Sequence, residues 1–173
     1  MPVESRAEIW LNKALEMENR GYDFYEDAAG KAKDSLVADF FKTLAAQELV
    51  HIKIIKQIYS RLGDDSCWLA AGDHHSGGAS LNKFFLALTQ HNTPGAKDDI
   101  VKAVETGIKF ETEAGKFYQE ALAGAGCEAE KKFLTKLVGE ENDHRVTLED
   151  LKLYYTDPAA WAERMDHGHL DGV

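Results

Sequence analysis

The sequence predicts an all-α fold, a four-helix bundle of two antiparallel hairpins joined by one long crossover, with a short C-terminal fifth helix. Four long stretches carry apolar residues at alternating steps of three and four, which is helical spacing. The connection within each pair of stretches is short, whereas the middle connection is long. Only three prolines occur among 173 residues, so long stretches are free to be helical.

The first hairpin begins with a capping box, Ser5-Arg6-Ala7-Glu8, which predicts the start of a helix. The second helix is expected from about Asp34 to Leu62, with Gly63 as the residue just past its end. The apolar stripes of these two helices also contain three polar residues: Glu18, Glu48 and His51.

The second hairpin is expected to begin after Thr93-Pro94-Gly95, and its second helix starts near Cys127 and ends at Asp157-Pro158. Its stripes contain Glu111, Glu141 and His144. The crossover, 63–95, is too long for a tight turn and includes a short apolar helix, 81–89. The fifth helix is expected over 158–165.

Composition and sequence motifs argue against several classes of protein. One domain is expected over 1–173. A net charge of -10 argues against nucleic acid, and no apolar run approaches the ~20 residues that cross a bilayer. The N-terminal segment 1–6 does not resemble a secretory signal. Cys67 and Cys127 form no Cys-x-x-Cys motif, so we expect reduced cysteines and a cytoplasmic protein.

The two halves match at an offset of 93 residues. Glu18 corresponds to Glu111, Glu48 to Glu141, and His51 to His144. In an antiparallel pair, facing residues have a constant index sum. Glu18 and Glu48 average to 33, and Glu111 and Glu141 to 126, and both midpoints lie in the expected turns. Each first-helix glutamate should therefore face the Glu-x-x-His of its partner helix, whose two side chains share one face.

Charge indicates what such a cluster binds. Four buried carboxylates cannot stay ionised and unpaired, and the stripes offer no facing Lys or Arg. Two divalent cations would cancel the four charges. Carboxylate oxygens with two neutral imidazoles suit iron or manganese.

At these residues the chain resembles the rubrerythrin branch of the ferritin-like superfamily, over roughly Ala7 to Tyr155. The resemblance implies that Glu48 and Glu141 bridge two metal ions, with one terminal Glu and one His on each ion. Tyr25 and Tyr118 would support the carboxylates in catalysis, although core packing is an equal alternative for both. Two features depart from the family pattern: there is no Cys-x-x-Cys motif, and Ala114 stands where an additional carboxylate is usual.

The resemblance implies a di-iron oxidoreductase that reduces hydrogen peroxide or oxygen, supplied with electrons by a rubredoxin or a flavoprotein. A ferroxidase or iron-handling protein is the first alternative. Manganese catalase-like chemistry and a non-enzymatic, metal-stabilised bundle, with manganese or zinc bound, are the others. We expect a homodimer, because Phe84, Phe85 and Trp161 need covering by the bundle ends or by a second subunit.

Several polar residues are expected to lie outside the site. His74 and His75 occur in a Gly/Ser-rich segment, and His167 and His169 occur in the polar tail, so the sequence assigns them no role. Glu140 and Asp143 flank the second Glu-x-x-His motif and are expected to be solvated.

Overall fold

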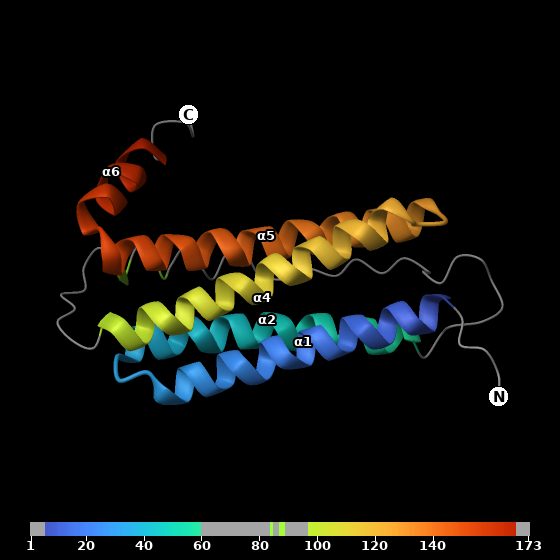
Figure 1. Cartoon of the computed structure of the whole chain (residues 1–173), viewed down its shortest axis with the longest axis horizontal. Coiled ribbons are helices and arrows are strands. Elements are labelled where there is room, and N and C mark those ends of the chain that lie inside the picture. Colours follow the sequence, from blue (N-terminus) through green and yellow to red (C-terminus); the bar gives the residue numbers. More distant parts are fainter. Residues whose placement is uncertain (1–5, 60–83, 85–86, 89–96, 169–173) are drawn as a thin grey trace.

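The computed structural model describes residues 6–59, 84, 87–88 and 97–168, and this part of the chain is helical with no strand. The helices are α1 (Arg6–Lys31), α2 (Ser35–Tyr59), α4 (Lys97–Ala123), α5 (Glu128–Thr156) and α6 (Pro158–Gly168). Figure 1 shows α1 beside α2 and α4 beside α5, with the two hairpins lying along each other and α6 turning away from the end of α5. The predicted all-α bundle with a short C-terminal helix is confirmed.

Polar side chains begin two of the helices. Asp34 Oδ1 accepts hydrogen bonds from the backbone N–H groups of Leu36 and Val37, which otherwise have no partner in the first turn of α2. Asp157 Oδ1 does the same for Ala160 at the start of α6. These two aspartates therefore set where the chain turns between neighbouring helices.

The core consists of two apolar clusters. One contains Tyr25 together with Phe41, Leu44 and Leu148, and the other contains Tyr118 together with Leu11, Ile55 and Leu134. Burial of such side chains is the main source of stability in a bundle, at roughly 1.5–3 kcal/mol each. Each cluster thus includes one of the two tyrosines that the sequence analysis singled out.

Several expected boundaries fall outside the described residues, namely Ser5, Leu62, Gly63, Thr93-Pro94-Gly95 and most of 81–89. The fifth helix starts at Pro158 as expected and extends to Gly168, three residues past Met165. None of the described helices is long and apolar enough to cross a membrane.

Phe84 and Trp161 are buried within this chain, which is one of the two alternatives expected for them, so neither residue needs a second subunit to cover it. Both join the cluster around Tyr25. Cys127, directly before α5, is disulfide-bonded, so the expectation of reduced cysteines is wrong for this residue.

Candidate metal centre

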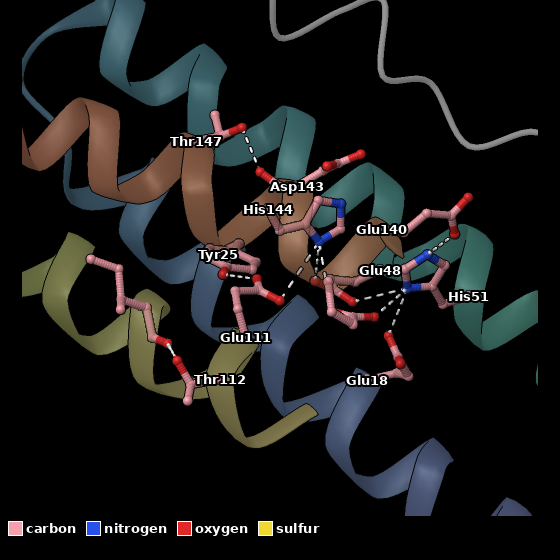
Figure 2. Close-up of polar contacts among 12 residues, drawn as sticks. Glu18, Tyr25, Glu48, His51, Glu111, Thr112, Glu140, Asp143, His144 and Thr147 are labelled. Carbon is pink, nitrogen blue, oxygen red and sulfur yellow. Dashed lines mark hydrogen bonds and ion pairs between the residues drawn. The ribbon is translucent and has the colours of Figure 1, made fainter. Parts of the chain in front are cut away.

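Six buried polar side chains meet midway between the two apolar clusters. They come from all four long helices, and none of them is more than 3% exposed: Glu18, Glu48, His51, Glu111, Glu141 and His144. The structure therefore brings together the whole set that the offset of 93 residues singled out. Figure 2 shows the two imidazoles on α2 and α5 with the carboxylates pointing toward them.

The two imidazole rings face the carboxylates through the same nitrogen. His51 Nδ1 lies 3.1 Å from Glu18 Oε2, 3.5 Å from Glu48 Oε2 and 3.3 Å from Glu141 Oε1. His144 Nδ1 lies 3.6 Å from Glu48 Oε1, 3.6 Å from Glu111 Oε2 and 3.8 Å from Glu141 Oε2. The ring centroids are 5.8 Å apart.

Glu48 and Glu141 each turn one oxygen toward each histidine. Glu48 presents Oε2 to His51 and Oε1 to His144, and Glu141 presents Oε1 to His51 and Oε2 to His144. Ligand atoms within 4.8 Å of one another therefore form two overlapping groups. One is Glu18, Glu48, His51 and Glu141, and the other is Glu48, Glu111, Glu141 and His144. A carboxylate shared in this way has the arrangement that bridging requires.

The tyrosines connect the two hairpins. Tyr25 on α1 donates its hydroxyl hydrogen bond to Glu111 Oε1 on α4, and Tyr118 on α4 donates to Glu18 Oε1 on α1. Burial raises the pKa of both phenols well above the ordinary value, so both stay protonated and act as donors. Each tyrosine therefore supports the terminal glutamate of the opposite half.

Two of the glutamates have raised pKa values in the metal-free protein. Burial raises the pKa of Glu18 to about 7, against the opposing effect of the His51 charge. Burial, with repulsion from Glu18 and Glu48, raises the pKa of Glu141 well above its usual range.

The other two glutamates pair with the imidazoles. Burial and the charge of Glu111 act to raise the pKa of Glu48, but the closeness of Glu18 and both imidazoles outweighs them and lowers it to about 2. For Glu111, burial is outweighed by the closeness and charge of His144, so the pKa is lowered. The pKa values of His51 and His144 are raised well above the usual range, because the carboxylates outweigh the effect of burial. Two carboxylates therefore balance two imidazolium ions.

Two atoms of the cluster bear on metal binding directly. Among the described residues, His144 Nδ1 and Glu141 Oε1 are buried and have no hydrogen-bond partner. Buried polar atoms without partners are costly unless something else satisfies them. A cation among these donors would satisfy both atoms, and four carboxylates with two imidazoles match the ligand preferences of iron and manganese. The residues present thus fit a metal pair.

A family model described as Rubrerythrin matches residues 10–152. The chain belongs to the Rubrerythrin family. No curated protein and no solved structure gives a significant match. Family membership and the buried carboxylate–histidine cluster together fit a di-iron protein.

A small cavity reaches the centre of this Rubrerythrin-family chain from between α1 and α4. Its volume is about 20 Å³, and a single water molecule needs roughly 10–15 Å³ on the same measure. The lining residues are Met17, Glu18, Arg20, Gly21, Glu48, Phe110, Glu111, Glu113, Ala114 and Glu141. The cavity therefore admits a molecule of a few atoms to the four glutamates, on the side away from the histidines.

Small residues flank the carboxylates in this cavity. A Cβ atom at Gly21 would lie 3.4 Å from Glu48 Cδ, which is ordinary contact, so a side chain longer than alanine would meet the glutamate. The 93-residue offset relates Gly21 to Ala114. Ala114 is the position where the family resemblance would place an additional carboxylate, and here both halves carry a small residue instead.

One contact of the centre was missed in the sequence analysis. Glu140 is not solvated as expected, because its Oε2 lies 2.9 Å from His51 Nε2 and its side chain is only 17% exposed. Asp143 is exposed, as expected. The signal that could have found Glu140 is its repeat partner Gln47, since both positions are polar and directly precede a glutamate of the cluster.

Proposed function

We propose that this chain is a non-haem di-iron oxidoreductase that reduces hydrogen peroxide or oxygen. The observation that carries the proposal is the pair of ligand groups sharing Glu48 and Glu141, with a small cavity ending on the same carboxylates. When bound, two adjacent Fe(II) ions supply the two electrons that split an O–O bond. For peroxide, two electrons and two protons yield two molecules of water.

The cavity supports a small substrate. At about 20 Å³ it suits dioxygen or hydrogen peroxide. Tyr25 and Tyr118 hold the terminal glutamates from the opposite hairpin, which keeps those carboxylates aimed at the centre while substrate enters.

The reductant comes from outside the chain in this proposal. The sequence contains no Cys-x-x-Cys motif that could hold a rubredoxin-type iron. A rubredoxin or a flavoprotein is the expected electron donor, and it would reduce the metal pair after each turnover. A homodimer remains part of the proposal, although Phe84 and Trp161 no longer argue for it.

Ferroxidase or iron-handling activity is the second candidate. The net charge of -10 favours the approach of Fe(II), and Glu113 adds a carboxylate to the cavity lining beside the four glutamates. In that case Fe(II) is the substrate and oxygen the oxidant, and the protein would turn over with these two alone.

Metal analysis of anaerobically purified protein, followed by stopped-flow mixing, tests the proposal. Protein loaded with two Fe(II) ions per chain should be oxidised rapidly by peroxide and should repeat the reaction after re-reduction. Turnover with only Fe(II) and oxygen, with slow peroxide reduction, would favour the ferroxidase. Native protein that holds manganese, zinc or no metal would refute the di-iron assignment.

A further inference from the structure

The two halves of the centre differ at the residue that directly precedes each shared glutamate. Glu140 precedes Glu141 on α5, and its repeat partner Gln47 precedes Glu48 on α2. One half therefore has a carboxylate where the other has an uncharged amide. Each of the six cluster residues, by contrast, has an identical residue type at the matching position.

Glu140 accepts a hydrogen bond from the outer nitrogen of His51. His51 Nε2 lies 2.9 Å from Glu140 Oε2, while Nδ1 faces the three carboxylates of its group. With Nδ1 directed at the metal position, the proton lies on Nε2 and is donated to Glu140. Figure 2 shows this contact on the side of the ring away from the cluster.

Glu140 lies beside a lysine and is mostly shielded from solvent. Lys136 Nζ lies 3.8 Å from Glu140 Oε1, one turn earlier on the same helix. The Glu140 side chain is mostly buried, so solvent weakens its interaction with His51 less than it would at an exposed site. The offset relates Lys136 to Thr43, so the other half lacks this cation as well.

A carboxylate acceptor changes an imidazole in two ways. It fixes the ring orientation and tautomer, and its negative charge makes the metal-binding nitrogen more basic. The amide of Gln47 carries no net charge. The two halves thus have a charged and an uncharged residue at this position.

We propose that Glu140 is a positioning residue that makes the metal position of Glu18 and His51 the tighter of the two, so that the two ions load in order. Glu140 acts through His51 and does not itself contact the metal. The proposal rests on the metal-binding part of the proposed function. It adds a difference in affinity between the two metal positions, which two identical halves would not have.

Anaerobic titration of metal-free protein with Zn(II), in competition with a chromophoric chelator, tests the order of loading. Wild-type protein should bind two ions with unequal dissociation constants. Glu140→Gln should weaken the tighter constant by about 10- to 100-fold and leave the weaker one in place.

Imidazole nitrogen NMR of the Zn(II)-loaded protein supplies a readout that a merely structural role would not move. Glu140→Gln should shift the Nε2 resonance of His51 and leave that of His144 unchanged. Lys136→Met is the matched control, because it removes a neighbour of Glu140 but keeps the hydrogen bond to His51.

The outcomes separate the two proposals. Wild-type protein that binds no second ion would refute the paired metal centre itself. Two ions bound by wild type, with both constants unchanged in Glu140→Gln, would overturn the positioning role and leave the metal centre intact. If Glu140→Gln does not fold, Glu140→Ala decides, since an unchanged tighter constant in that variant equally overturns the proposal.

Discussion

Tyr118 on α4 donates its hydroxyl hydrogen bond to Glu18 on α1, which belongs to the other hairpin. The equivalent bond runs from Tyr25 on α1 to Glu111 on α4. These two bonds link the hairpins at the level of the cluster. They also separate the two interpretations of the tyrosines, because a packing role alone would leave the hydroxyl groups unimportant.

Tyr118→Phe should lower the free energy of unfolding of the metal-free protein by about 1–3 kcal/mol, because the buried Glu18 carboxyl loses its donor. Denaturant unfolding measures this change. Tyr22→Phe, at a half-buried tyrosine on α1, is the control and should have little effect. Equal changes in the two variants would support simple packing.

Stability of the metal-free protein should fall as pH rises from about 4.5 through 7. In this range the folded state keeps a proton on Glu18, whose pKa is raised from 4.5 to about 7, whereas the unfolded chain has lost it. Glu141 and the two imidazoles, with raised pKa values, act in the same direction. Because the folded state binds more protons, stability decreases with pH.

Glu18 alone should account for about 3 kcal/mol of that decrease. Urea unfolding at a series of pH values measures the slope, and Glu18→Gln should flatten it. The metal-loaded protein should show the opposite trend, because protons compete with the ions for the same atoms. A metal-free protein whose stability rises steadily to pH 8 would contradict the assigned protonation.

Glu48→Ala should leave fewer than one ion per chain, because Glu48 turns one oxygen toward each histidine. His51→Ala should retain one ion, since His51 belongs to only one of the two ligand groups. Titration of metal-free protein with Fe(II) under nitrogen gives both numbers. Glu113→Ala, at an exposed cavity-lining residue, is the control and should still bind two ions. Two ions in Glu48→Ala would rule out bridging by this residue.

Ala114→Leu should slow the reaction with peroxide by about tenfold or more while leaving the metal content unchanged. Ala114 lines the cavity of about 20 Å³, and three additional carbon atoms would fill it. Gly115→Ala, one residue further along α4, is the matched control, since its Cβ would lie 3.9 Å from Glu141 Cβ. An unchanged peroxide rate in Ala114→Leu would mean that substrate reaches the centre by another path.

Purified protein with NADH or NADPH alone should show negligible peroxidase activity. No Cys-x-x-Cys motif is present to relay single electrons to the centre. Adding a rubredoxin or a flavoprotein together with its reductase should restore steady turnover, measured as NAD(P)H consumption. Rapid consumption without any added carrier would contradict an external donor.

Most of the bundle follows from local pattern. Helical spacing and short turns fix the two hairpins, and the index sums of Glu18 with Glu48 and of Glu111 with Glu141 place these residues at matching levels. Helix ends are harder to predict, because helix propensity changes little over one turn. The predicted end of α6 at Met165 is three residues too early for this reason. The burial of Phe84 and Trp161 depends on contacts between distant segments, which spacing does not encode.

In the candidate site, too, local pattern predicts some features and only the packing of distant segments reveals others. Its six polar residues stand out because charged groups on an apolar stripe are unusual, and that signal is local. The partners of Tyr25 and Tyr118 depend on how one hairpin rests on the other. Glu140 lies off the stripe and reaches His51 with a long side chain, so only the three-dimensional packing reveals the contact.

Below about pH 7, the protonation of the metal-free cluster makes it an electroneutral ion exchanger. In this range Glu18 and Glu141 hold carboxyl protons, and His51 and His144 carry a second proton on each ring. Each arriving divalent ion therefore replaces two protons, and the interior has zero net charge before and after loading. Filling the centre consequently leaves the long-range field of this acidic protein nearly constant, so a charged redox partner meets the same surface whether or not metal is bound.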